Sequence, residues 1–202
     1  MAEALAANGA ADKNVLMLGG SSLDNNVPVV EDGFKAVCDK ENMTVIDSIH
    51  CDGWRAEIAG EYIYEHEDTV RDAAGIMCGN DNLAGQVIRA LSEKRLAGDI
   101  PVVGQDADLE ACQRIVEGTQ TMTVYKPVEK LAKRAAECAI ALAKGEALTG
   151  DDVSTWNDGT YDIPYIGLTP IAVTRDNLDS VIIASGFHLK EDVYLNAPEK
   201  MR

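Results

Sequence analysis

The sequence is poor in the residue types that most often carry catalysis or hold metals. Its 202 residues include 3 His and 5 Cys. No Cys lies in a C-x-x-C pair, and none alternates with His at the spacing of zinc ligands. A nucleophile motif such as G-x-S-x-G is also missing. The sequence therefore predicts no metal site, no cofactor site and no enzyme. The scattered His residues are expected on the surface or satisfied in the core, at His50, His66 and His188.

An odd number of cysteines fits poorly with a disulfide framework. Two explanations stay open: the thiols are small buried apolar residues, or the protein works in a reducing compartment. The residues concerned are Cys38, Cys51, Cys78, Cys112 and Cys138.

Basic residues are scarce, and long apolar runs are missing. The chain has 18 Lys and Arg against 34 Asp and Glu, a formal net charge of -16. Such a surface repels nucleic acids and anionic membranes. No run of about 18 apolar residues exists, so no membrane span is expected. The start MAEALAANGAADKN has neither a cationic segment nor a long apolar one, so no signal peptide is expected in this chain.

What the chain does have is a repeating unit of a short apolar strand, a polar loop and a helix, which recurs about five times. The strands are expected over residues 14–18, 43–50, 74–79, 100–104 and 121–125, and the helices over 2–7, 27–39, 55–73, 81–95, 109–117 and 128–144. This alternation predicts an α/β fold with a doubly wound parallel sheet. After Gly145 the chain becomes turn-rich and β-like, with a hairpin turn at Asp158-Gly159 and a short strand over 181–184.

Polar and aromatic residues follow the ends of these predicted strands. In an open parallel sheet, the residues beyond the carboxyl ends of the strands line the ligand crevice. A carboxylate and an ammonium group at one edge suit a neutral polyhydroxylated ligand, because together they offer acceptors and donors. The predicted rim consists of Asn25 or Asn26, Trp54, Asn80, Asp106 and Lys126.

Each motif at this edge has an alternative. The loop Gly19-Gly20 onward lacks both the P-loop and the dinucleotide patterns, which disfavours a phosphate site. Trp54 either stacks on an apolar sugar face or simply packs. Of Asn80 and Asp81, one faces the ligand while the other caps the next helix, and Asp81 is the expected cap. Asp106 and Asp108 are too close in one loop to act as a glycosidase pair.

Several strings resemble one known family. GGSSLDNN, CDGW, CGNDNLAG, GQDADLEACQRIVEGTQTMTVYKP and SGFH occur in this order along nearly the whole chain. They resemble the xylose-binding group of the type I periplasmic sugar-binding proteins, the receptors of ABC sugar importers. The resemblance implies a two-lobed, non-catalytic, extracytoplasmic receptor that closes on one monosaccharide, with a pentose as the expected ligand and an ABC permease as the partner.

The resemblance also implies roles for individual residues. Asn80, Asp106 and Lys126 match positions that hydrogen-bond the sugar in this family, and Trp54 matches a residue that stacks on the ring. Asn25 and Asn26 lie in the matching ligand-side loop, without a choice between them. A sensing module that reports sugar to a kinase or regulator remains the alternative, since one fold serves both roles.

Against this family the chain is expected to lack most of the N-terminal lobe. The resemblance divides it into a C-terminal sugar-binding lobe over 1–126, incomplete at its start, a helix and β segment of the other lobe over 127–168, and a return crossover and tail over 169–202. The helix would then expose an apolar stripe, and we expect association with a second copy or with a separate chain that bears the other lobe. The stripe consists of Val128, Leu131, Ala135, Cys138 and Leu142.

Overall fold

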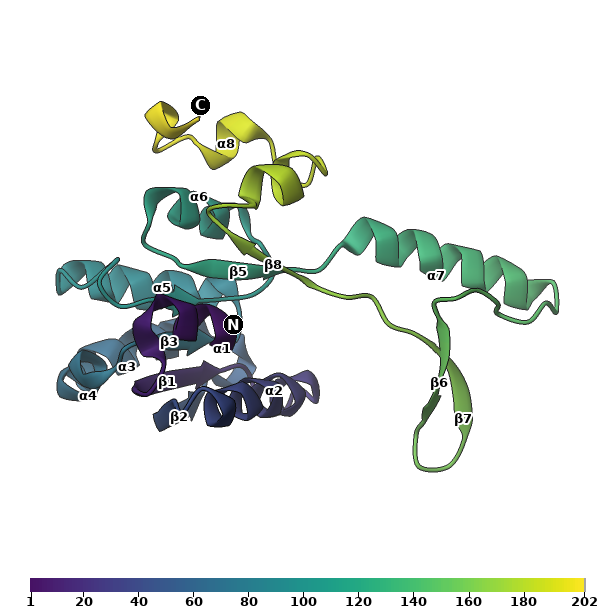
Figure 1. The fold of residues 1–202 in the computed structure, drawn as a ribbon, viewed down its shortest axis with the longest axis horizontal. Coiled ribbons are helices and arrows are strands. Elements are labelled where there is room, and N and C mark those ends of the chain that lie inside the picture. The colour runs from purple at the N-terminus through teal and green to yellow at the C-terminus, as the bar shows by residue number, and fades with distance from the viewer. Residues whose placement is uncertain (202) are drawn as a thin grey trace. The chain divides into compact units, whose positions relative to one another are not determined.

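The computed structural model describes residues 1–201 and contains two compact units (Figure 1). The first unit holds Met1–Tyr125 together with the chain from Ala172 onward, and the second holds Lys126–Ile171. The chain therefore crosses between the units twice, after Tyr125 and before Ala172.

The first unit is built on a six-stranded sheet in the order β2-β1-β3-β4-β5-β8. The strands are β1 Asn14–Gly19, β2 Thr44–His50, β3 Ile76–Cys78, β4 Val102–Val103, β5 Met122–Tyr125 and β8 Ile171–Thr174. The pairs β1 with β2, β1 with β3, β3 with β4 and β4 with β5 are all parallel. This confirms the predicted parallel sheet. The strand order reverses between β1 and β3, and ligands of open α/β sheets bind at the carboxyl side of such a point.

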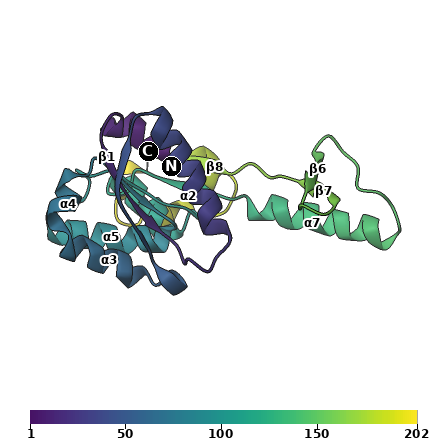
Figure 2. The same ribbon diagram turned by 90° about the horizontal axis from the view of Figure 1, so that it is seen from below.

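Helices cover both faces of this sheet, as Figures 1 and 2 show. They are α1 Ala2–Leu5, α2 Asn26–Lys40, α3 Ala56–Glu65, α4 Glu67–Asp72, α5 Asp81–Glu93, α6 Leu109–Glu117 and α8 Lys190–Val193. Strand β1 serves two cores because its side chains alternate: Leu16 and Leu18 pack with α3 and α5, whereas Val15 and Met17 pack with α1 and α2. The doubly wound arrangement is confirmed.

Two predicted elements differ from the structure. The single helix expected over 55–73 is broken at His66, whose backbone N–H donates to Tyr62 O (3.0 Å) and whose Nδ1 lies 3.1 Å from the same oxygen. The His66 ring also stacks on the Tyr62 ring, with centroids 4.3 Å apart. The strand expected over 181–184 is wrong as well, because Asp179–Ile183 is a π-helical segment. A four-residue apolar run does not distinguish a buried strand from a buried helical turn.

The second unit consists of one helix and one hairpin. Helix α7 spans Val128–Ala143, and the antiparallel strands β6 Val153–Asn157 and β7 Asp162–Ile166 form the hairpin. The predicted turn at Asp158-Gly159 is confirmed. Asp158 Oδ1 accepts from the backbone N–H of Thr160 and of Tyr161, each at 2.8 Å, and Gly159 adopts φ +95°.

The apolar stripe of α7 is largely exposed, as expected. Val128, Leu131 and Leu142 are 53%, 55% and 60% exposed, and α7 has no buried residue. Trp156 and Tyr165 of the hairpin are also about half exposed, at 53% and 50%. A unit of this size cannot bury enough apolar surface by itself to form a core.

Candidate functional site

Four of the predicted rim residues follow parallel strands of the first unit. Trp54 follows β2, the pair Asn25 and Asn26 follows β1, Asn80 follows β3, and Asp106 follows β4. Because these strands are parallel, the four loops lie at one edge of the sheet. Lys126 comes directly after β5 in the chain and is the first residue of the second unit.

The indole of Trp54 lies at the point where the strand order reverses. A methyl group placed on Gly20, after β1, would overlap the indole, and one on Gly79, after β3, would come within 3.4 Å of it. The glycine at position 20 is therefore what lets the ring lie this close to the backbone, whereas a side chain at Gly79 would first meet the backbone of Gly20, at 2.9 Å. The ring is partly buried on the adjacent core, so it packs there and still presents part of its surface.

Hydrogen bonds between two loops fix the segment that carries Trp54. Asp52 Oδ1 accepts from Ser22 N (3.0 Å) and Ser22 Oγ (2.7 Å), and Gly53 N donates to Ser21 Oγ (3.1 Å). These bonds to Ser22 hold the pKa of the exposed Asp52 below its ordinary value. The loop after β1 and the loop after β2 are thus joined as one surface.

The two candidate amides after β1 lie at the start of α2. Asn25 is the residue before the helix and Asn26 its first residue. Asp24 Oδ1 accepts from Asn26 N (2.9 Å) and from Asn26 Nδ2 (3.1 Å). Both Asn side chains are exposed, and the choice between them as ligand residues stays open.

The assignment of the helix cap after β3 was wrong. Asn80 is the N-cap of α5, since its Oδ1 accepts from Leu83 N at 2.9 Å. This bond orients the Asn80 side chain and leaves its Nδ2 group as the donor that the residue can offer to a ligand. Asp81, the predicted cap, is instead 1% exposed and points into the protein.

Asp106 lies on a strained turn after β4 that the neighbouring strand β5 supports. Its φ is +108° and that of Ala107 is +57°, a conformation that non-glycine residues rarely adopt. The backbone is held by Asp106 N donating to Val124 O (2.9 Å) and by Ala107 N donating to Thr123 Oγ1 (3.0 Å). Such strain persists only where the surroundings impose it, and it occurs often at ligand sites.

Beneath this turn lies the buried carboxylate of Asp81. Its Oδ1 accepts from Gln120 Nε2 (2.8 Å), and its Oδ2 accepts from Thr123 Oγ1 (2.6 Å) and from Asp108 N (3.1 Å). Burial raises the pKa of Asp81 to about 6, although these hydrogen bonds oppose the shift. Gln120 and Thr123 were not predicted from the sequence. Their role depends on hydrogen bonds to Asp81, which lies 39 and 42 positions away in the chain.

The C-terminal segment supports the same turn from another side. His188 Nε2 donates to Ala107 O at 2.8 Å, and Phe187 packs on Tyr125 with ring centroids 4.8 Å apart. His188 is therefore a satisfied, partly buried residue, one of the two settings expected for it. The SGFH string places it there, near the end of β5.

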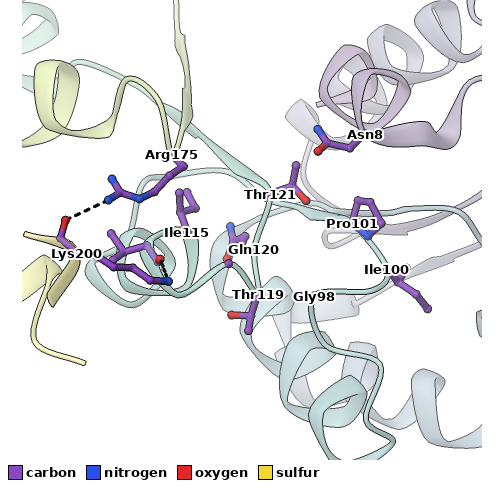
Figure 3. Close-up of a pocket in the computed structure, with 12 residues that line it drawn as sticks. Asn8, Gly98, Ile100, Pro101, Ile115, Thr119, Gln120, Thr121, Arg175 and Lys200 are labelled. Carbon is purple, nitrogen blue, oxygen red and sulfur yellow. Dashed lines mark hydrogen bonds between the residues drawn. The ribbon is translucent and has the colours of Figure 1, made fainter. Parts of the chain in front are cut away.

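A hollow of about 430 Å³ opens at the opposite edge of the sheet, near the amino ends of β4 and β5 (Figure 3). The two cationic side chains that line it, Arg175 and Lys200, both hydrogen-bond to other groups of the protein. Lys200 Nζ donates to Val116 O (3.0 Å), and Arg175 donates to Tyr194 Oη (3.0 Å) and to Lys200 O (3.3 Å). These bonds attach the C-terminal segment to α6, which explains the polar lining without a ligand.

The cysteines are free thiols, and Cys38, Cys51, Cys78 and Cys112 are buried. Burial raises the pKa of Cys38 and of Cys51 to about 11 and that of Cys112 to about 12, so these thiols stay protonated at neutral pH.

Within residues 1–201, no cluster of three or more His, Cys, Asp or Glu is arranged to hold a metal ion. None of the helices in that range has the length and apolarity to cross a bilayer.

The fold is that of the type I periplasmic binding proteins. A family model described as "Periplasmic binding protein domain" matches residues 1–147, and the chain belongs to this family. A solved carbohydrate transporter solute binding protein from Chloroflexus aurantiacus, in complex with D-glucose, matches with a TM-score of 0.77. That match covers 95% of this chain and 66% of the other at 23% identity, so it shows a common fold only.

Among curated proteins, the chain is similar to D-xylose-binding periplasmic proteins. It is 40% identical to that of Haemophilus influenzae over 90% of this chain and 55% of the relative. It is 38% identical to that of Escherichia coli over 89% of this chain and 56% of the relative. The chain thus spans about half the length of these relatives. By their names the relatives are binding proteins rather than enzymes.

Proposed function

We propose that this chain binds a monosaccharide, with xylose or a related pentose as the preferred ligand, at the carboxyl edge of its sheet. The observation that carries the proposal is the Trp54 indole, which lies against the backbone of Gly20 and Gly79 where the strand order reverses. Apolar sugar faces stack on such rings. Asn80 and the turn of Asp106 follow the next two strands and supply polar groups for hydroxyls. The xylose-binding names of the relatives support the choice of a pentose.

The proposed role is that of a substrate-binding component of an extracytoplasmic ABC sugar importer, without catalysis. In this proposal, residues 1–126 are the sugar-binding lobe, 127–168 belong to a second lobe, and 169–202 return to the first. Asn25 or Asn26 and Lys126 complete the ligand-binding set. A sensing module that reports sugar to a kinase or regulator is the alternative, and the identity of the neighbouring gene product, permease or kinase, discriminates the two.

We further propose that the exposed stripe of α7 is covered by association, with a second copy of this chain or with a chain that bears the matching lobe. Support comes from the 53–60% exposure of Val128, Leu131 and Leu142, in a unit that has no core of its own. A strictly monomeric species by light scattering at high concentration, together with no excess apolar surface accessible to a dye, would count against this proposal.

Calorimetric titration of the 202-residue chain with xylose, arabinose, ribose and glucose tests the sugar proposal. We expect saturable, weak binding with a pentose ahead of glucose, because one lobe covers only one side of the ligand. Micromolar binding would mean either that the other lobe is not needed or that a second copy supplies the other wall. A folded chain that gives no saturable heat with any of the four sugars would contradict the proposal.

A further inference from the structure

Asp81, a buried residue, joins the loops that follow β3 and β4 to strand β5. Its backbone N–H donates to Gln105 O (2.8 Å), the residue before Asp106. Its side chain accepts from Asp108 N, two residues after Asp106, and from Thr123 of β5. Asp81 also directly follows Asn80. The turn of Asp106 is thus held on both sides by one residue that does not itself reach the sheet edge.

We propose that Asp81 is a positioning residue for the sugar site: its ionised carboxylate holds the turn of residues 105–108 in the conformation that presents Asp106. The inference rests on the proposed function, since it concerns the same site. It adds a role for a residue with no proposed sugar contact, and it makes sugar binding dependent on pH.

The observed hydrogen bonds match an ionised carboxylate at this position. All three groups that point at Asp81 oxygens are donors: the Gln120 amide, the Thr123 hydroxyl and the Asp108 N–H. Gln120 cannot easily turn its amide round, because its Oε1 accepts from Arg114 Nε at 2.9 Å. A proton on Oδ1 would therefore face the Gln120 donor, and a proton on Oδ2 could bond to Thr123 Oγ1 only if that hydroxyl gave up its present bond to Asp81.

The Asp81 carboxylate fills the space beside the backbone of Gly104. A methyl group on Gly104 would overlap Asp81 Oδ1 and would lie 3.1 Å from Gln120 Nε2 and 3.3 Å from Ala84 Cβ. Because Gly104 has no side chain, it leaves room for the Asp81 carboxylate at this strand end. The Asp81 side chain is packed against strand β4 at Gly104 and is hydrogen-bonded to the turn at Asp108. We therefore expect a substitution at Asp81 to displace the turn rather than the closely packed strand.

Other ionisable groups surround Asp81 on every side. Cys78 approaches from β3, Cys112 and Arg114 from α6, and Asp108 from the turn. Arg114 donates to the backbone oxygen of Asp81 (3.0 Å), and its positive charge favours the ionised form. Asp108 acts in the opposite sense, as a neighbouring negative charge. The thiols remain neutral over the range considered, since burial raises the pKa of Cys78 and Cys112.

The pH dependence of stability and of binding should run in opposite directions. Because burial raises the pKa of Asp81 from 3.8 to about 6, the protonated form favours the fold, and this contribution is lost as pH rises through about 6. Sugar binding should instead improve over the same range, because the ionised form holds the turn. We expect the affinity of the wild-type chain to fall about tenfold between about pH 7 and about pH 5.

Three variants and one control variant test the proposal. Asp81→Asn removes the charge and one acceptor. Thr123→Val removes the hydroxyl that links Asp81 to Ala107 N, and Thr123→Ser restores it. Asp39→Asn, an exposed site on α2, is the matched control. Two measurements are made on each: xylose affinity at about pH 7 and about pH 5, and hydrogen exchange at the Ala107 and Asp108 amides, with Leu18 of β1 as a reporter of global unfolding.

We expect Asp81→Asn and Thr123→Val to weaken xylose binding about tenfold and to speed exchange at Ala107 and Asp108 by a similar factor, with Thr123→Ser close to wild type. In Asp81→Asn the change in affinity between the two pH values should be smaller than in wild type, because Asp108 and His188, which also belong to or contact this turn, are unchanged. Exchange at both amides that equals wild type in Asp81→Asn and Thr123→Val would overturn the positioning role. If the wild-type chain binds no sugar while exchange responds as expected, positioning of the turn stands and the proposed function fails.

Discussion

Replacing Asp106 with Asn is expected to weaken sugar binding about 10- to 100-fold with little change in stability. A carboxylate that accepts from sugar hydroxyls makes charge-assisted hydrogen bonds of roughly 1.5–3 kcal/mol each, and every 1.4 kcal/mol is about tenfold in affinity. Asn keeps the size of the side chain and tolerates the φ of +108° better than other residues would. The substitution therefore removes the charge without disturbing the turn.

The matched control for this variant is Asp99→Asn. Asp99 is exposed and precedes β4, whereas Asp106 follows it, so the two variants change equal charge at opposite ends of one strand. Calorimetric titration with xylose and the melting temperature are measured for both. Equal affinities for wild type and Asp106→Asn would remove Asp106 from the site, and an equal loss in both variants would indicate an effect of net charge alone.

The second large effect concerns association through α7. Leu131→Glu combined with Leu142→Glu should convert an associated species to a monomer, because each substitution places a charge in the apolar stripe. Ala136→Glu combined with Ala143→Glu adds the same charge to the same helix, about 100° or more round the axis from the centre of the stripe. Both control positions are exposed.

Light scattering over a range of protein concentrations distinguishes these outcomes. At high concentration the wild type and the double variant Ala136→Glu with Ala143→Glu should both have the mass of the associated species. The double variant Leu131→Glu with Leu142→Glu should have the monomer mass at every concentration. Association should also strengthen with salt, because each copy carries a net charge of -16 and screening weakens their repulsion. A wild-type chain that is monomeric at every concentration would leave a separate lobe-bearing chain as the partner to be sought.

Most of the framework could be predicted from the sequence, because local pattern determines it. The strand over 14–18 is a buried apolar run bounded by glycines, and the helix over 109–117 coincides with α6 Leu109–Glu117. Parallel pairing then places strand-end residues at one edge without further information. This is why the loops of Trp54, Asn80 and Asp106 were expected to share an edge, and the structure confirms that they do.

The errors occur where hydrophobic periodicity and residue type do not decide the structure. His66 ends a helix with non-helical backbone angles (φ −120°, ψ 44°), a break that hydrophobic periodicity does not register. Asn80 and Asp81 both suit an N-cap by type, so their roles could not be separated locally. Thr123 and Gln120 draw Asp81 inward from 39 or more positions along the chain. The buried hydrogen bonds of Asp81 with Gln120 and Thr123 therefore could not be predicted from the sequence.

The central claim, that a sugar binds on the Trp54 side of the sheet, can be tested with the indole N–H signals of the two tryptophans. The chain contains 2 Trp, Trp54 at the proposed site and Trp156 in the hairpin of the second unit, so one is the internal control for the other. Titration of ¹⁵N-labelled chain with xylose should shift the Trp54 indole signal saturably and leave that of Trp156 unchanged. A Trp54 signal that stays fixed while calorimetry detects binding, or equal shifts of both signals, would contradict the account.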